Sequence, residues 1–415
     1  MSEIDTGIAK PVPAVAVSDP ALAQHRLAAL DGMRAVAAVG VVVVHVSIYT
    51  GNIAAGFNHR MHSGWVGYVT QPISVAVPFF CVMAGMLLYR QFTGTALHGK
   101  PMPSVGAYLW RRALRVLPLY WLVVIVALLA VNHDVGVWGW IRGLSFLTIY
   151  HRNKYGSADL PSGLVPTWSL ASEAVFYLLL PVMAAVLAWA ATRFGRDLAA
   201  RARITLALLV PVLGFQLAWV AIVHGRSFGQ WPMQWYWLPN LIGYFGAGMM
   251  LAVLLDWARD APERPPALYR LAQGRPYLLW LIALTCFVAL GFPQLLGHDA
   301  NTFYPGVRQG VDQYLLHLVC ATCLVLAIVA GKRNRLLTAP VLVLGGQLSY
   351  GIYIWHEVVL EIYFKARGFR PGDGDPATTL PIVLGGAIVL AWLSYTVVEK
   401  PVRRTLRPLL GKAAA

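Results

Sequence analysis

The chain has 415 residues, of which 58% are hydrophobic and only 12% are charged. Soluble domains have about a quarter charged residues, so this composition excludes an ordinary soluble domain. Apolar segments of about 20 residues, the length of a membrane-spanning helix, recur from one end of the sequence to the other. The net charge of +15 comes from short basic clusters between these segments. That distribution is typical of loops that orient helices and contact anionic membrane lipids, so we expect no nucleic-acid partner.

The sequence therefore predicts an all-α polytopic protein of the inner (plasma) membrane, with about ten transmembrane helices and both termini in the cytoplasm. We expect a disordered cytoplasmic tail over residues 1–25, a membrane domain over 26–402 and a basic cytoplasmic tail over 403–415. The N-terminal segment lacks a basic region followed by an apolar core, so it does not have the pattern of a cleaved signal peptide. The predicted spans are 28–49, 66–89, 113–131, 164–191, 203–224, 235–256, 276–293, 313–331, 341–363 and 377–399.

An eleventh apolar segment, 135–150, is short and contains Arg142 among several glycines and tryptophans. If this segment crossed the membrane, every later loop would change sides. The richest Lys/Arg clusters would then lie outside the cytoplasm, against the positive-inside rule. We therefore expect 135–150 to be an interfacial or re-entrant segment.

The first span carries Asp31 and Arg34 near its cytoplasmic end and His45 near its outer end. Arg34 and His45 are eleven residues apart, which places them on one helix face within about 20° and about 16 Å apart along the axis. Asp31 is one turn from Arg34 and can pair with it. One interpretation is an arginine that extends to the headgroups and a histidine bonded to a carbonyl. The shared face favours a functional use of both.

Three arginines, Arg111, Arg112 and Arg115, lie at the predicted cytoplasmic end of the third span. Arg112 and Arg115 are one turn apart and project together, with Arg111 beside them. Paired guanidiniums bind phosphate well because each offers forked donors and keeps its charge when partly buried. Basic residues also commonly begin an outward-running span, so spacing alone leaves both interpretations open.

The fourth span begins with Ser169, Glu173 and Tyr177 on one face. A carboxyl group inside a membrane domain usually marks a functional site. Since this helix runs inward, Glu173 is expected within about two turns of the outer surface, close to His45 in depth.

The ninth span places His356 in the outer half, with Glu357 and Glu361 nearer the surface. A structural role for His356 is an equal alternative. Cys320 and Cys323 have the CxxC spacing, but in an apolar helix they are expected to be small core residues, and no metal site is expected.

Depth therefore divides the candidate residues into two levels. Arg34, Arg112 and Arg115 are expected at the inner level, and His45, Glu173 and His356 at the outer level. A phosphate-bearing ligand held from the cytoplasm, with proton transfer near the opposite face, requires this arrangement.

Four stretches resemble the acyltransferase-3 family of membrane-embedded acyltransferases, which O-acylate sugars, exported glycans and glycolipids. They follow the family's order and extend over nearly the whole chain. The stretches are LDGMRAVAAVGVVVVH, RRALRVLPLYW, WSLASEAVFYLLLP, and LSYGIYIWHEVV with SYTVVEKPVRR.

The resemblance implies O-acyl transfer, in most cases O-acetylation, from cytoplasmic acyl-CoA (acetyl-CoA above all) to a hydroxyl of an envelope sugar, glycan or glycolipid. Arg112 and Arg115 would hold the phosphates of the coenzyme, and Arg34 would line the channel. His45 would take the proton from the acceptor hydroxyl, and Glu173 would orient His45 or assist that transfer. Many relatives carry a carboxylate after the first helix, but residues 46–63 contain none and offer only His59, Arg60 and His62.

Two other functions remain open from the sequence. A proton-coupled transporter or flippase of a glycan or lipid would use a buried His and Glu to relay protons. The sequence shows no inverted repeat of the kind found in such transporters. A non-catalytic relative that acts as a subunit is the third alternative.

Overall fold

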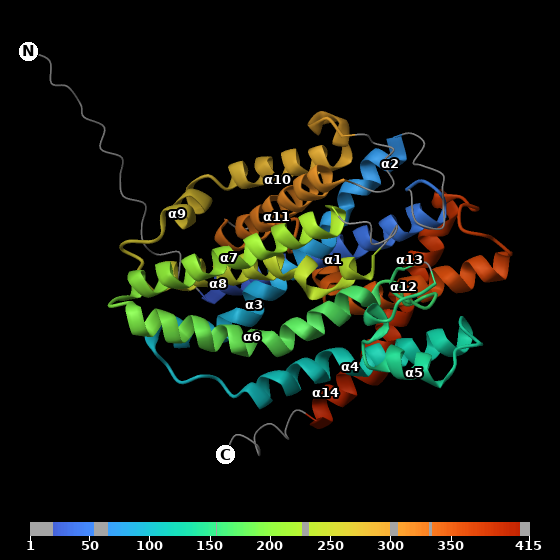
Figure 1. The fold of residues 1–415 in the computed structure, drawn as a ribbon, viewed down its shortest axis with the longest axis horizontal. Helices are drawn as coiled ribbons and strands as arrows, with labels where there is room; N and C mark the ends of the chain where they lie inside the picture. Colours follow the sequence, from blue (N-terminus) through green and yellow to red (C-terminus); the bar gives the residue numbers. More distant parts are fainter. Residues whose placement is uncertain are drawn as a thin grey trace, which may run out of the picture.

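The computed structural model describes residues 20–53, 65–154, 156–225, 232–298, 306–331 and 334–406. These residues form a bundle of helices that lie side by side (Figure 1), with no strand among the described segments. The helices are α1 (Pro20–Tyr49), α2 (Trp65–Thr70), α3 (Ala76–His98), α4 (Val105–Ala130), α5 (Val137–Leu144), α6 (Thr167–Phe194), α7 (Leu198–Gly225), α8 (Ile242–Asp260), α9 (Ala267–Gly274), α10 (Pro276–Gly291), α11 (Val307–Ala330), α12 (Pro340–Arg367), α13 (Pro376–Ser394) and α14 (Lys400–Leu406).

The all-α polytopic membrane architecture is confirmed, but the number of apolar spans is lower than the predicted ten. Seven helices of the described chain are long and apolar enough to cross a membrane, or eight if the bent pair α9–α10 forms one span. The predicted spans 235–256 and 341–363 correspond to α8 and α12, which fall outside that count. Both helices pack in the interior, α8 against α3 and α12 against α1. Their buried polar residues, such as Asp256 in α8 and Glu357 in α12, lower the mean hydropathy of both helices.

Helices of the described chain overlap both segments predicted as tails. Helix α1 begins at Pro20, inside the segment 1–25, and α14 extends to Leu406, inside the segment 403–415. Proline is favoured in the first turn of a helix, where its missing N–H is not needed. Residues 1–19 and 407–415 lie outside the described chain.

The segment 135–150 does not cross the bundle, as predicted. It forms the eight-residue helix α5 and a short 3-10 turn at Thr148–Tyr150. At 1.5 Å per residue, α5 is about 12 Å long, well below the thickness of a bilayer. Tyr120 and Trp121 of α4 donate hydrogen bonds to the carbonyls of Gly143 and Leu144, which fixes the segment against α4.

Glycines allow the closest helix crossings of the bundle. A Cβ at Gly85 of α3 would lie 2.2 Å from the Phe245 carbonyl oxygen of α8. A Cβ at Gly248 of α8 would lie 2.0 Å from the Val82 carbonyl oxygen of α3. Small residues permit such close backbone approach between membrane helices. The α3–α8 pair is therefore held by reciprocal glycine contacts.

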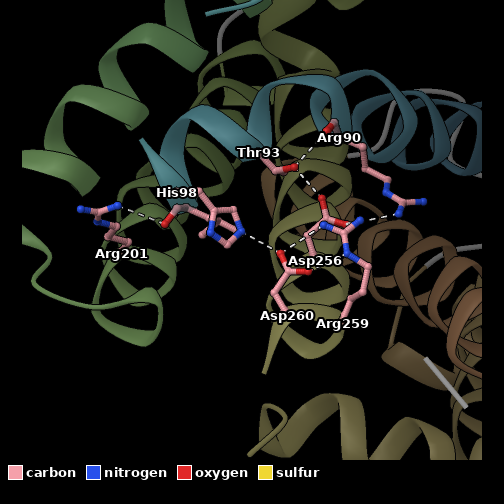
Figure 2. A network of polar contacts seen from close by, with 8 residues as sticks. Arg90, Thr93, His98, Arg201, Asp256, Arg259 and Asp260 are labelled. Atoms are coloured by element: carbon pink, nitrogen blue, oxygen red, sulfur yellow. Dashed lines mark hydrogen bonds and ion pairs between the residues drawn. The ribbon is translucent and has the colours of Figure 1, made fainter. Parts of the chain in front are cut away.

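A network of ion pairs joins α3 to α8 at their C-terminal ends (Figure 2). The buried carboxylate of Asp256 accepts hydrogen bonds from Arg90 Nη2 at 3.2 Å and from the Thr93 hydroxyl. Arg259 Nη1 lies 3.1 Å from the same carboxylate. Beside it, His98 Nε2 is 2.7 Å from Asp260. This end of the crossing is held by polar contacts.

Replacing Asp256 by asparagine is expected to destabilise the bundle, because two guanidiniums lose their buried counter-charge. A lost hydrogen bond to a charged group costs about 1.5–3 kcal/mol, and the partial exposure of both arginines reduces the effect toward the lower value. Thermal unfolding in detergent measures the change, with the exposed Asp134→Asn as a matched control. Equal melting temperatures for the two variants would contradict this role for Asp256.

Candidate active site

Two cavities of different chemistry lie next to each other between the helices. The first, here called the arginine cavity, has a volume of about 250 Å³ and is lined by Arg34, Arg112 and Arg115. The second, the histidine cavity, has a volume of about 280 Å³ and is lined by His45. The structure thus brings the three predicted arginines together and places His45 in a separate volume.

Two arginines of the arginine cavity have a side-chain nitrogen without a hydrogen-bond partner. Arg34 Nη1 pairs with Asp31 at 3.1 Å, but Arg34 Nε is buried without a hydrogen-bond partner. Arg112 Nε is also buried and unpartnered. A buried donor without a partner is costly, and guanidiniums bind anions through charge-assisted hydrogen bonds, so the cavity is chemically suited to an anion.

Arg111, the third predicted arginine of α4, does not belong to this site. Its Nη2 donates to Gln91 Oε1 at 3.2 Å, and it does not line the cavity. One residue along a helix turns a side chain by about 100°, which separates Arg111 from Arg112.

Glu173 lines the arginine cavity, so the structure corrects its predicted position beside His45. Its carboxylate accepts a hydrogen bond from the Tyr177 hydroxyl at 2.6 Å. The partners of His45 are residues of α12 instead. Among the described contacts, none joins Glu173 to His45.

The physical reason is the start of α6, which lies inside the bundle rather than at its outer surface. The Tyr353 hydroxyl of α12 donates to the Pro166 carbonyl oxygen at 2.9 Å. A Cβ at Gly163 would lie 3.4 Å from the Cα of Val358, also in α12. The connection before α6 therefore reaches the depth of α12 residues 353–358. Glu173 lies about 9 Å further along α6, toward the arginines.

His45 and His356 form the centre of the histidine cavity. His45 Nδ1 and His356 Nε2 are 2.6 Å apart, and the two rings are nearly coplanar with an angle of 10°. Glu357 Oε2 lies 3.6 Å from His45 Nδ1 and 3.7 Å from His356 Nε2. His356 and Glu357 are fully buried, whereas the His45 side chain is 16% exposed. These three residues also offer ligand atoms within 4.8 Å of one another, a spacing that suits a metal ion.

Glu357 is a residue of this cluster that the sequence pattern did not single out, because it was expected nearer the surface. Residues Gly351–Val358 are all buried, so this part of α12 has no lipid face. On such a helix, neighbouring positions all point into protein. The signal in the sequence was a carboxyl group directly after His356.

Tyr353 is the second missed residue, and it lines both cavities together with Val77. Its hydroxyl is 2.7 Å from Ser169 Oγ, which places the predicted candidate Ser169 at the boundary. Tyr353 precedes His356 by three residues, a helical spacing that could have identified it. His59, Arg60 and His62, which follow the first predicted span, lie outside the described residues.

The four cysteines are free thiols, and Cys320 donates from Sγ to the Ala283 carbonyl oxygen at 3.3 Å. Cys320 is buried in the apolar core. The CxxC pair therefore packs as small core residues, as expected from its apolar surroundings.

Two comparisons relate the chain to known proteins. The chain is 34% identical over 103 residues to the exopolysaccharide production protein ExoZ of Rhizobium meliloti strain 1021, a match that covers 23% of this chain and 31% of ExoZ. The chain thus matches about a third of the length of this curated relative. No solved structure gives a significant match. The Acyl_transf_3 family model, described as "Acyltransferase domain", matches residues 27–396 and includes both cavities. The chain belongs to this acyltransferase-3 family.

Proposed function

We propose that this protein is a membrane O-acyltransferase that moves an acyl group, above all acetyl, from cytoplasmic acyl-CoA to a hydroxyl of an envelope sugar, glycan or glycolipid. The observation that carries the proposal is the pair of adjacent cavities, which share Tyr353 and Val77 as a wall. One cavity offers cationic groups and the other a histidine. Family membership supports acyl transfer, and the name of ExoZ supports a polysaccharide acceptor.

The arginine cavity is suited to the donor. Guanidiniums hold phosphates through paired charge-assisted hydrogen bonds, and Arg112 and Arg34 have buried donors to spare. Glu173 and Tyr177 lie in the same cavity, where the carboxylate offsets part of the positive charge. In this proposal Glu173 positions the donor site rather than His45.

The histidine cavity is suited to the chemical step. His45 takes the proton of the acceptor hydroxyl while its oxygen attacks the thioester carbonyl. The C–S bond breaks, a C–O bond forms, and the coenzyme leaves as a thiolate that receives the proton from His45. The products are the O-acyl ester and free coenzyme A.

Replacing Arg115 by alanine is expected to raise the KM for acyl-CoA by about tenfold to a hundredfold, because one charge-assisted phosphate contact is worth about 1.5–3 kcal/mol. The kcat at saturating donor is expected to change little. Titration of the purified protein with acetyl-CoA measures the effect. The matched control is Arg111→Ala, on the same helix but bonded to Gln91 outside the cavity. Equal KM values in the two variants would contradict the assignment.

The function itself is tested with the protein in lipid nanodiscs and acetyl-CoA labelled in the acetyl group. Label is expected to appear in a hydroxyl-bearing glycan or glycolipid from the envelope of the source cells. Lipid and glycan analysis of a deletion strain is expected to show the loss of an O-acyl group. If the protein neither binds coenzyme A nor transfers label, the proposal fails. Uptake of a glycolipid into vesicles without consumption of acyl-CoA would indicate the transporter instead.

A further inference from the structure

The hydrogen bond between His45 and His356 is strongly directional. The ring centroids are 4.9 Å apart while the facing nitrogens are 2.6 Å apart, and the rings are nearly coplanar. The two nitrogens therefore lie between the rings and point at each other. One of them carries a proton and the other presents a lone pair, because two lone pairs at this distance would repel.

The second nitrogen of His356 decides which ring donates. His356 Nδ1 lies 3.3 Å from the Ile352 carbonyl oxygen, one turn earlier in α12. A carbonyl oxygen only accepts hydrogen bonds, so His356 Nδ1 must carry the proton. In a neutral imidazole the other nitrogen, Nε2, is then the acceptor.

We propose that His356 fixes His45 in the tautomer with its proton on Nδ1, which leaves the lone pair of Nε2 as the catalytic base. The chain of hydrogen bonds runs from His45 Nδ1–H to His356 Nε2, and from His356 Nδ1–H to the Ile352 carbonyl. No hydrogen bond from a described residue occupies His45 Nε2. His356 is a positioning residue that acts through His45. The catalytic role assigned to His356 rests on the proposed function, whereas the tautomer of His45 does not.

The arrangement also accounts for the protons during transfer. When Nε2 of His45 takes the acceptor proton, His45 becomes an imidazolium with protons on both nitrogens. Nδ1–H keeps its hydrogen bond to His356, so the ring does not turn. The Glu357 carboxyl, 3.6 Å from Nδ1, stabilises that positive charge when it is ionised. The Nε2 proton then passes to the leaving thiolate.

A metal ion at the same residues would require a different geometry. Both histidine lone pairs would have to converge on one point about 2.0–2.1 Å from each nitrogen. In the structure these nitrogens point at one another, with room only for a shared proton. The two arrangements make opposite predictions for the protonation of the rings.

The tautomer is measured by NMR of the full-length protein labelled with [¹⁵N]histidine, in lipid nanodiscs without donor or acceptor. The spectrum is taken near pH 9, well above the ordinary histidine pKa of about 6.5, so that the rings are neutral. The His45 signals are assigned by their loss in His45→Gln. We expect a protonated Nδ1 and a bare Nε2 at His45, with no change on adding EDTA. A protonated Nε2 at His45 overturns the proposal, as does an EDTA-sensitive shift, which would show a bound metal.

Variants of His356 test the role in catalysis. The amide oxygen of His356→Gln can accept the proton of His45 Nδ1, whereas His356→Ala cannot. In His356→Ala we expect a mixture of His45 tautomers and a kcat lower by about 10²- to 10⁴-fold, with the acyl-CoA KM unchanged. In His356→Gln we expect the tautomer and most of the kcat to be retained. Equal losses in both variants, with folded protein and an unchanged His45 tautomer, would overturn the positioning role. Inactive wild-type protein that nevertheless has the expected tautomer would refute only the proposed function.

Discussion

Replacing His45 by alanine is expected to abolish acyl transfer while leaving acyl-CoA bound. His45 lines the histidine cavity, apart from the three arginines that are proposed to face the donor. Loss of a general base lowers rates by about 10²- to 10⁴-fold, and no other described histidine but His356 contacts His45. Radiolabelled acetyl transfer measures turnover, and equilibrium binding of acetyl-CoA measures the donor affinity.

The control for His45→Ala is His151→Ala. His151 is a loop residue outside both cavities, and its Nδ1 lies 3.1 Å from Asp159 Oδ2. This variant should keep wild-type transfer. Full turnover in His45→Ala would disprove the assigned base, and a parallel loss of acetyl-CoA binding would show that His45 belongs to the donor site.

Replacing Gly248 by alanine is expected to destabilise the fold strongly. The added methyl would lie 2.0 Å from the Val82 carbonyl oxygen and 2.7 Å from the Met86 nitrogen, both of them backbone atoms. Helices α3 and α8 must then separate, and overpacking of this kind costs about 1–3 kcal/mol or more. Thermal unfolding in detergent and the monodisperse fraction on size exclusion measure the loss.

Gly214→Ala is the matched control, because nothing lies within 4 Å of a Cβ at this position in α7. Alanine favours a helix over glycine by about 1 kcal/mol, so this variant should be as stable as the wild type or slightly more so. If the two alanine variants melt together, the close α3–α8 crossing is wrong.

Most of the helices could be predicted from the sequence, because lipid-facing helices need long apolar segments. The exceptions are informative. α8 and the middle of α12, Gly351–Val358, lie inside the bundle, where neighbouring helices surround them, so hydropathy describes them poorly. The same property made Glu357 hard to place, since a helix without a lipid face gives no periodic signal.

The candidate site was predictable in part, because spacing along one helix is reliable whereas depth between helices is not. Arg112 and Arg115 share a turn of α4 and do line one cavity with Arg34. Glu173 was misplaced because its depth was counted from an assumed start of α6 at the membrane surface. The connection before α6 enters the bundle as far as Tyr353, and no local sequence pattern predicts this depth.

The wall formed by Tyr353 and Val77 between the two cavities has a consequence for the transmembrane potential. A donor from one side of a membrane and an acceptor from the other would meet most simply in an open pore. A pore would also conduct protons and dissipate the transmembrane potential that powers transport. Here the Tyr353 ring stands between the two volumes, anchored by its hydroxyl to Pro166. In the reaction proposed above, this wall would keep the two volumes separate except where the acyl group passes from one to the other.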